Sequence, residues 1–404
     1  MRILWSANAL WATTGYGVQG RSLLPRLQRL GHTVANHAWY GLAGGTMEAG
    51  DIRIYPAAFE PYGADIIGHW VKDFQADLVV SLMDNWVLPQ DFVERCRPAL
   101  WASWFPVDQT PLPPCVGRIS RTADYPITYS QFGQNQALAA GIDACRYIPH
   151  GVETSVYKPG DKAEARRRLG VPQDRYLVSM VAANKGYPSR KAFPENLEAF
   201  ARFRRRHPEA LLYLHTLASQ ANQGLDLFEL LAALGIPEDA VFFVNQPKYI
   251  LGLPPEYMAR IYQASDVLLA ASQSEGFGIP IVEAQACGCP VISTNWTSMP
   301  EITVNGIATE PLQRLWTPLG GWACVPGVDA IHEALEEIAA WRPNERREFS
   351  ELGVAFMRAH YDWDVCVQTY WAPFLAQVEE DLRAGNRQGQ AGPVEAGSAG
   401  AVLA

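Results

Sequence analysis

The chain has 404 residues, of which 48% are hydrophobic and 19% charged, and its formal net charge is −9. At roughly 150 residues per domain this length allows two or three domains with sizeable cores. The negative net charge argues against a protein that coats nucleic acid without sequence preference. No apolar run reaches the roughly 18 residues of a membrane span. Seven cysteines without paired spacing argue against a disulfide framework and favour a reducing, cytoplasmic location.

In the first half of the chain, short apolar segments rich in β-formers alternate with segments of helical length. The expected strands are 2–9, 33–40, 77–84, 99–108 and 125–130. A helix is expected between the first two strands, over residues 18–31. This alternation predicts βαβ units, and therefore a parallel sheet with helices on both faces.

The second half of the chain repeats the same alternation. Its expected strands are 176–183, 210–217, 240–246, 266–272 and 290–295, with a helix over 194–207. About ten such units exceed one typical open sheet. We therefore predict an α/β fold with two doubly wound, Rossmann-like domains that face each other across a cleft.

The Gly-, Pro- and charge-containing segment 148–162 marks the expected seam between the domains. We expect a first domain over residues 1–152, a second over 153–360, a C-terminal helix over 361–382 and a disordered tail over 383–404. The basic runs 166–168 and 204–207 are expected to be solvated helix faces. Their alternative role is contact with an anionic membrane surface.

The stretch SEGFGIPIVEAQACGCPVIS, residues 274–293, places two glutamates, Glu275 and Glu283, eight positions apart. It follows the expected strand 266–272, and ligands of doubly wound sheets bind outside the carboxyl ends of strands. A helix is expected to begin at residues 279–280, where proline is favoured.

The expected helix N-terminus carries a partial positive charge that suits phosphate. Gly276 and Gly278 allow the backbone to approach a ligand closely. The pattern therefore indicates an anion at the helix end, with the hydroxyls of a sugar and of a ribose held by Glu275 and Glu283.

The same stretch resembles the E-x7-E motif of retaining GT-B glycosyltransferases, especially family 4. Four further segments resemble that family in order along the chain. They are the first glycine loop and helix at 15–34, the interdomain segment at 148–159, the basic loop at 183–200 and the last helix at 360–375. The resemblance spans nearly the whole chain. It implies an acceptor-side first domain, a second domain that binds the nucleotide-sugar and a last helix that crosses back to the first domain.

The resemblance also implies roles for individual residues. Glu275 contacts the donor sugar's hydroxyls, Glu283 binds the ribose, and Lys191 grips the diphosphate. Five residues are expected to present backbone or charge to the donor: Gly17, Lys185, Phe277, Gly278 and Ile279. Where the family has an arginine, this chain has Lys185 as the best-aligned residue, and Arg190 is the other candidate for that role. A lysine keeps the charge but loses bidentate geometry.

On the acceptor side the family often has a histidine, whereas this chain has Asp108. Asp108 is expected to act in catalysis, with capping of the proline-rich segment after it as the alternative. The pair Asp362 and Asp364 matches the metal-binding D-x-D pattern of glycosyltransferases of the other major fold. Its position before a long amphipathic segment favours helix capping instead.

The implied activity is retaining transfer of a sugar from a nucleotide-sugar to an unknown acceptor, which is a sugar, a lipid or another small molecule. UDP is favoured as the nucleotide, with GDP and ADP as alternatives. No metal or cofactor is required, no nucleic acid is bound, and any membrane contact is peripheral. Two alternatives stay open: another GT-B enzyme, such as a nucleotide-sugar epimerase or a phosphorylase, and a noncatalytic nucleotide-sugar binding protein.

Overall fold

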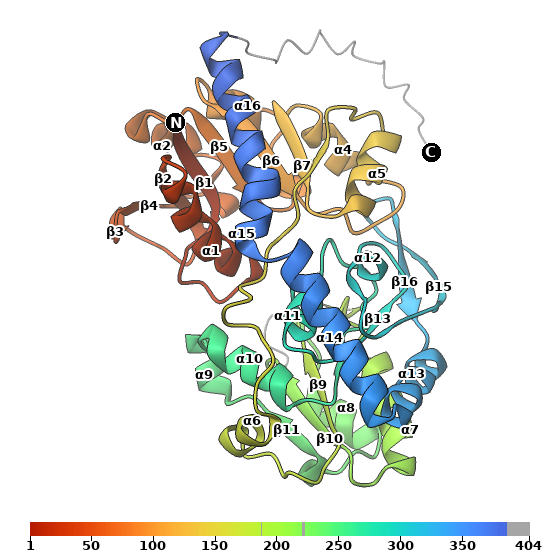
Figure 1. Ribbon diagram of the computed structural model, residues 1–404. Coiled ribbons are helices and arrows are strands. Elements are labelled where there is room, and N and C mark those ends of the chain that lie inside the picture. The colour runs from red at the N-terminus through yellow and green to blue at the C-terminus, as the bar shows by residue number, and fades with distance from the viewer. Residues whose placement is uncertain (187, 220–222, 386–404) are drawn as a thin grey trace, which may run out of the picture.

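The computed structural model describes residues 1–186, 188–219 and 223–385. Figure 1 shows two α/β domains, one coloured red to yellow and the other olive through green and teal to blue, with the blue C-terminal helix α16 (Ala372–Arg383) returning to the first. Each domain is organised around one sheet, wholly parallel in the second domain and parallel except for β3 (Met47–Ala49) in the first. The expected α/β fold of two Rossmann-like domains is confirmed.

The first sheet has the strand order β3-β4-β2-β1-β5-β6-β7-β8, and β3 alone is antiparallel to its neighbour. Its strands are β1 Arg2–Asn8, β2 Thr33–Tyr40, β3 Met47–Ala49, β4 Ile52–Pro56, β5 Leu78–Leu82, β6 Leu100–Phe105, β7 Tyr125–Thr128 and β8 Arg146–Tyr147. The central strands β5 and β6 are buried along their whole length. This burial on both faces is why they read as continuous apolar runs.

Helices cover both faces of this sheet. They are α1 Gly15–Arg29, α2 Ile67–Phe74, α3 Phe92–Cys96, α4 Pro114–Ser120 and α5 Gln131–Ala139. Helix α1 begins three residues before the expected 18–31, because the Thr14 side chain caps it by accepting a hydrogen bond from the Gly17 N–H. The glycine loop therefore forms the first turn of the helix.

The second sheet is wholly parallel, in the order β11-β10-β9-β12-β13-β14. Its strands are β9 Leu177–Val181, β10 Leu211–His215, β11 Val241–Phe243, β12 Val267–Leu269, β13 Val291–Thr294 and β14 Ile307–Thr309. Its helices are α6 Lys162–Leu169, α7 Phe193–Arg206, α8 Leu227–Ala233, α9 Gln246–Leu251, α10 Pro255–Ala264, α11 Ile279–Ala286, α12 Met299–Ile302, α13 Val328–Ala340 and α14 Pro343–His360. Counted along the chain the order is 3-2-1-4-5-6, the doubly wound arrangement in which ligands bind where the order reverses.

A hairpin of β15 Pro311–Trp316 and β16 Trp322–Pro326 extends from the second domain. Its strand β16 reaches the loop that follows β6. The backbones of Thr110 and Trp322 exchange two hydrogen bonds, with N–O distances of 3.2 and 2.8 Å. The hairpin therefore joins the two domains.

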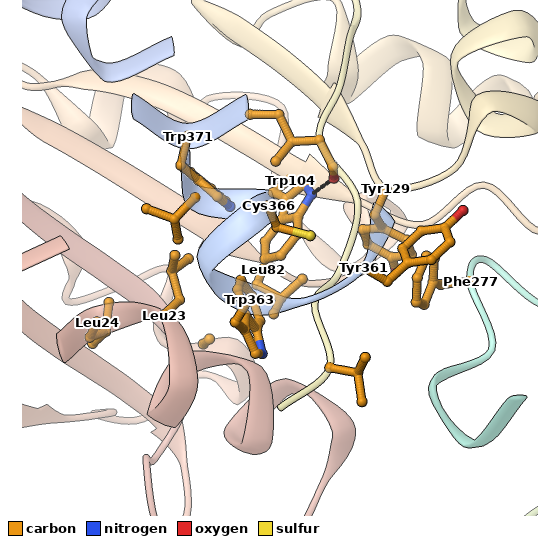
Figure 2. Packing of buried hydrophobic residues seen from close by; sticks show 14 of the residues in the cluster. Leu23, Leu24, Leu82, Trp104, Tyr129, Phe277, Tyr361, Trp363, Cys366 and Trp371 are labelled. Atoms are coloured by element: carbon orange, nitrogen blue, oxygen red, sulfur yellow. Dashed lines mark hydrogen bonds between the residues drawn. The ribbon is translucent and has the colours of Figure 1, made fainter. Parts of the chain in front are cut away.

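The C-terminal segment consists of α15 Trp363–Cys366, a π-helical turn Val367–Trp371 and α16 Ala372–Arg383. Trp363 and Trp371 are buried against the first domain, and Figure 2 shows them near Trp104, whose indole N–H donates to the Ile148 carbonyl at 2.8 Å. A side chain at Gly151 would collide with the Trp363 ring. The crossing segment is therefore packed into the first domain's core.

Helix α16 ends one residue inside the tail expected to be disordered, and residues 386–404 of that tail lie outside the described residues. None of the helices in the described ranges is long and apolar enough to cross a membrane. The expected domain boundaries stay a prediction.

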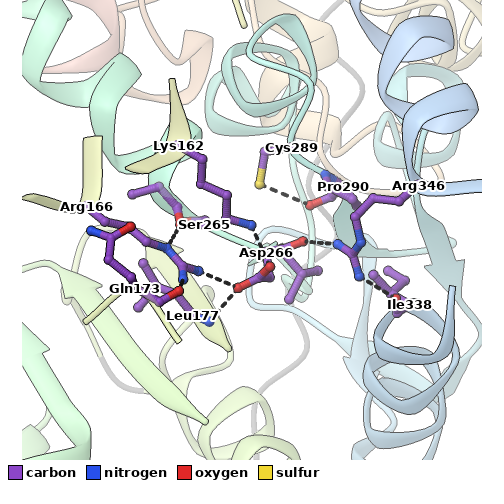
Figure 3. Close-up of polar contacts among 12 residues, drawn as sticks. Lys162, Arg166, Gln173, Leu177, Ser265, Asp266, Cys289, Pro290, Ile338 and Arg346 are labelled. Atoms are coloured by element: carbon purple, nitrogen blue, oxygen red, sulfur yellow. Dashed lines mark hydrogen bonds and ion pairs between the residues drawn. The ribbon is translucent and has the colours of Figure 1, made fainter. Parts of the chain in front are cut away.

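The basic run 166–168 is only partly the solvated helix face that the sequence indicates. Arg166 is buried and donates to Asp266 at 2.7 Å, while Lys162 donates to the same carboxylate at 2.5 Å (Figure 3). The exposed residues Arg167 and Arg168 pair with Glu164 on their own helix. One of the three arginines therefore fastens α6 to the second sheet.

Candidate active site

The loop between β12 and α11 carries the first glutamate of the motif. Helix α11 begins at Ile279, as expected, and Gly278 precedes it with φ +109°, a conformation that favours glycine. The Ser298 hydroxyl donates to the carbonyls of Glu275 and Phe277 at 2.8 and 2.9 Å. The loop is therefore fixed by a serine from α12's N-cap, a residue that the sequence reasoning did not identify.

Glu275 is buried and contacts two basic side chains from the loop before α7. Lys191 Nζ donates to Oε1 of Glu275, and Arg190 Nη1 donates to Oε2 at 3.2 Å and to the Ser274 carbonyl at 2.5 Å. Burial opposes ionisation, but the charges of Lys191 and Arg190 lower the pKa of the Glu275 carboxyl to about 2. Glu275 is therefore ionised at neutral pH.

The two candidates for the family arginine occupy different surroundings. Lys185 is exposed to solvent. Arg190 is 46% exposed along its side chain, yet its guanidinium contacts Glu275. The structure thus brings together Arg190, Lys191 and Glu275 but places Lys185 outside this cluster.

The glycine loop of the first domain faces α11 of the second. A Cβ atom at Gly15 would lie 3.2 Å from Cδ1 of Ile279, whereas one at Gly17 would collide with the carbonyl oxygen of Ala12. Gly17 is therefore required by the packing of its own loop. Phe277 is buried, and its ring lies 6.5 Å from that of Tyr129 and 5.6 Å from that of Tyr361 (Figure 2).

Glu283 lies one turn into α11 and is buried. The Tyr262 hydroxyl donates to its Oε2 at 2.8 Å, and burial raises the pKa of the Glu283 carboxyl to about 7. Glu283 also lines a cavity of about 220 Å³ between α1, the interdomain segment and α10. The second glutamate is therefore reachable from a space between the domains.

Asp108 lies in the loop that follows β6 of the first sheet. Burial raises the pKa of its carboxyl, Arg190 opposes that shift, and Glu275 adds to it. Asp84, which follows β5, was missed from the sequence. Burial and the charge of Asp108 raise the pKa of Asp84 to about 6, against the effect of Arg190.

Two tyrosines that the sequence reasoning also missed border these aspartates. The hydroxyls of Tyr16 and Tyr129 are 3.5 Å apart, and the charges of Asp84 and Asp108 help to raise the pKa of both tyrosines, after burial. Tyr16 belongs to the glycine loop and Tyr129 follows β7. The segments that follow β1, β5, β6 and β7 therefore each carry one of these polar residues, at the carboxyl ends of the first sheet's strands.

Within the described residues, no group of three or more His, Cys, Asp or Glu side chains could hold a metal ion. The D-x-D pair has other partners: Asp362 caps α15 by accepting from the Asp364 N–H at 2.8 Å, and Asp364 accepts from Arg26 Nε at 2.7 Å. The expected capping role of Asp362 is confirmed.

Residues 161–353 match the family model of glycosyl transferases group 1. The D-inositol 3-phosphate glycosyltransferase of Acidothermus cellulolyticus is 34% identical over 157 residues, which cover 37% of this chain and 33% of the relative. The protein of the same name from Geodermatophilus obscurus is 30% identical over 249 residues, covering 59% and 49%. The chain thus spans a third to a half of the length of these curated relatives.

Solved structures resemble the chain over almost its full length. Sucrose-phosphate synthase from Thermosynechococcus elongatus superposes with a TM-score of 0.74 at 18% identity, covering 95% of this chain and all of that one. HepE from Anabaena, in complex with UDP and glucose, gives a TM-score of 0.67 at 17% identity and covers the same shares. At these identities the likeness concerns the fold.

Proposed function

We propose that this protein is a retaining glycosyltransferase that uses a nucleotide-sugar donor. The premise is that residues 161–353 match the family of glycosyl transferases group 1 and that the chain has the GT-B fold. The observation that supports this most directly is the cluster of Glu275, Lys191 and Arg190 beside the N-terminus of α11. The ionised carboxylate of Glu275 can accept hydrogen bonds from sugar hydroxyls, and Lys191 and Arg190 can bind a diphosphate. In this proposal Glu275 holds the sugar, and the two basic groups stabilise the diphosphate as it leaves.

The leaving diphosphate gains negative charge as its bond to the sugar breaks. Lys191, Arg190 and the N-terminus of α11 are placed to stabilise that charge where it develops. We assign the role of the family arginine to Arg190 rather than Lys185, because only Arg190 contacts Glu275. The departing phosphate then takes the acceptor's proton on the face from which it leaves, which retains the anomeric configuration.

The other site residues complete the donor site in this proposal. Glu283 accepts hydrogen bonds from the ribose hydroxyls, and its position on the wall of a cavity supports that role. The backbones of Gly17, Phe277, Gly278 and Ile279 approach the phosphates and the sugar. Asp108 acts on the acceptor side.

UDP is the proposed nucleotide. The observation in its favour is that HepE, which shares the fold, binds UDP and glucose in its crystal structure. We also propose that transfer requires no metal, because two basic side chains and a helix N-terminus already face the diphosphate. A cytoplasmic location belongs to the same proposal.

Thermal shift with UDP-, GDP- and ADP-glucose tests the proposal first. The correct donor at 100 times its dissociation constant should stabilise the protein by roughly 2.7 kcal/mol. NMR of the reaction should then show a new glycosidic bond with the donor's anomeric configuration, and EDTA should leave the rate unchanged. An intact nucleotide attached to an isomerised sugar would identify an epimerase, and binding without bond cleavage would identify a noncatalytic protein.

A further inference from the structure

The loop that carries Glu275 packs directly on a tyrosine of the other domain. Tyr129 follows β7 of the first sheet and is 3% exposed. A Cβ atom at Gly276 would lie 3.1 Å from Cε2 of the Tyr129 ring and 2.7 Å from Cβ of Pro106. Gly276 does not have the positive φ that Gly278 has. Glycine is therefore needed at position 276 because two first-domain side chains approach its backbone closely, which leaves no room for a Cβ atom.

The neighbouring residues of this loop are held by hydrogen bonds within the second domain. The Ser298 hydroxyl donates to the carbonyls of Glu275 and Phe277, and the Glu275 N–H donates to Thr297 Oγ1 at 3.1 Å. The loop is therefore fixed within its own domain, and its packing on the first domain adds a second constraint.

The Tyr129 ring is itself packed among other rings. Its centre lies 4.2 Å from that of His150 in the interdomain segment, 5.8 Å from that of Trp104 on β6 and 6.5 Å from that of Phe277 (Figure 2). Side chains packed at such density have little room to move. The ring therefore offers the loop a rigid contact surface.

The segment that follows Tyr129 is also joined to the second domain. The backbone N–H groups of Gln131 and Phe132 donate to the Glu301 carboxylate, both at 3.1 Å. These two hydrogen bonds are formed two and three residues after Tyr129. They therefore help to fix where this tyrosine meets the second domain.

The ring of Tyr129, rather than its hydroxyl, makes the contact with the loop. The hydroxyl lies 3.5 Å from that of Tyr16, which is at the outer limit of a hydrogen bond, whereas the ring abuts the backbone of Gly276. We propose that Tyr129 is a positioning residue, whose ring holds the loop 274–278 in the geometry in which Glu275 meets the donor sugar.

This role rests on the proposed function and adds a first-domain residue to that site. A displacement of about 1 Å at a reacting group can lower a rate by about a hundredfold. A packing contact on the residue next to Glu275 can therefore act on turnover without touching the substrate.

Hydrogen–deuterium exchange and donor cleavage test this role together. Tyr129→Leu removes the ring, so the amides of residues 274–278 should exchange faster by about tenfold or more. UDP release from UDP-glucose, with water as the acceptor, should fall by about tenfold or more. The thermal shift produced by UDP-glucose should be retained, because Glu283 and Lys191, which are proposed to bind the nucleotide, are unchanged.

Two further variants separate positioning from a general loss of packing. Tyr129→Phe keeps the ring and should restore most of the protection and of the rate that Tyr129→Leu loses. Tyr125→Leu is the matched control, because Tyr125 lies on β7, is 6% exposed and packs against Phe374 of α16 instead. It should lower the melting temperature without changing exchange in the loop or UDP release.

Gly276→Ala changes the same contact from the second domain. Its Cβ atom would collide with Pro106 and Tyr129, so UDP release should fall about as far as in Tyr129→Leu. This variant decides the question if Tyr129→Leu does not fold, since native UDP release in Gly276→Ala would then overturn the proposal.

Native exchange and native UDP release in Tyr129→Leu would likewise overturn the positioning role. Equal losses in Tyr129→Phe would do so by assigning the effect to the hydroxyl, and equal losses in Tyr125→Leu by assigning it to general packing. In each of these cases a retained thermal shift and UDP release by the native protein leave the proposed function standing. A native protein that binds no nucleotide-sugar would refute the proposed function, and this role of Tyr129 with it.

Discussion

At the scale of single residues, the contact of Lys191 with Glu275 leads to the first prediction. Lys191→Ala removes a basic group proposed to stabilise the leaving diphosphate, so kcat should fall by roughly a hundredfold or more. Lys185→Ala, its matched control, removes an exposed lysine of the same loop and should change kcat little. Steady-state transfer rates at saturating donor measure both effects. Equal losses in the two variants would mean that Lys185 also acts on the diphosphate.

Glu283 leads to a prediction about pH. Because burial raises the pKa of its carboxyl to about 7, the ionised form that best accepts ribose hydroxyls becomes dominant only above that pH. The Kd for UDP-glucose should therefore fall as the pH rises from 6 to 8. UDP-glucose is the suitable ligand because its diester phosphates do not titrate in this range.

Glu283→Gln is the control for this pH effect. The amide oxygen can still accept from Tyr262, but the residue no longer titrates, so affinity should be weaker at pH 8 and much less dependent on pH. Isothermal titration calorimetry at several pH values measures the difference. A variant with the native pH profile would assign the effect to another group, of which Asp84, with a pKa of about 6, is the first candidate.

The sequence indicated the residues that belong to a spaced pattern. Glu275, Glu283 and Lys191 could be proposed as site residues because the two glutamates and the basic loop have recognisable neighbours along the chain. Asp84, Tyr16 and Ser298 could not, because each is a single polar residue in a loop whose partners are distant in sequence. The contact of Arg190 with Glu275, on which we base the proposal that Arg190 rather than Lys185 takes the family arginine's role, depends on loop geometry rather than on alignment.

At the scale of elements, α12 and α5 provide the third prediction. The Glu301 carboxylate of the second domain accepts from the backbone N–H groups of Gln131 and Phe132 in the first domain, both at 3.1 Å. Glu301→Ala leaves these groups without that partner and should destabilise the protein by about 0.5–2 kcal/mol, as loss of a helix cap does. Ser130→Ala, which removes the helix's own cap, is the local comparison.

The Glu301→Gln variant adds a pH test. Burial raises the pKa of Glu301 to about 7, so the folded protein binds this proton more tightly than the unfolded chain does. The associated stability is fully present below the unfolded pKa, near 4.5, and is lost as the pH rises through 7. As the pH rises from 5 to 8, the Glu301→Gln variant should therefore become more stable relative to the native protein. Melting temperatures that keep a constant difference across this range would contradict the assignment.

The elements that the sequence predicted include the long, buried ones, and also short strands such as β11 and β12. Strands β1, β5, β6, β9 and β10 are mostly apolar and mostly buried, and helices α1 and α7 bury one face. Some missed strands have weak patterns, since β8 has two residues and β15 is largely exposed, but β4 and β16 are mostly buried and were missed as well. The β15–β16 hairpin is stabilised by its pairing with the first domain, which no local pattern of residues could indicate.

At the scale of the whole molecule, composition and alternation were enough to predict two doubly wound domains, because each strand-helix unit carries its own apolar signal. The way in which the domains meet depends on contacts between distant residues. The charge of Arg190 in the second domain lowers the pKa of Asp84 and Asp108 in the first domain, against the effect of burial, and β16 of the second domain pairs with Thr110 of the first. The acceptor side was therefore the part of the site that sequence reasoning described least.

The last prediction concerns Arg26 of α1, which joins three segments. Its side chain is 10% exposed and donates to both oxygens of Glu153 in the interdomain segment, at 2.9 and 3.0 Å, and to Asp364 of α15 at 2.7 Å. Glu153→Ala removes two charge-assisted bonds from a buried guanidinium and should cost about 1.5–3 kcal/mol. Asp364 is 69% exposed, so solvent screening should limit the cost of Asp364→Ala to less than about 1 kcal/mol.

Urea unfolding of both single variants and of each combined with Arg26→Met measures these couplings. The Arg26–Glu153 coupling should be the larger one, and the midpoint shift of Glu153→Ala should largely disappear in the Arg26→Met background. This order follows from burial, because both carboxylates contact the same guanidinium but only Glu153 is shielded from water. Equal couplings would contradict the predicted order, and a larger one for Asp364 would mean that α1 is held mainly to the crossing segment rather than to the interdomain segment. The second domain would then be free to move relative to α1 without breaking the main contact of Arg26.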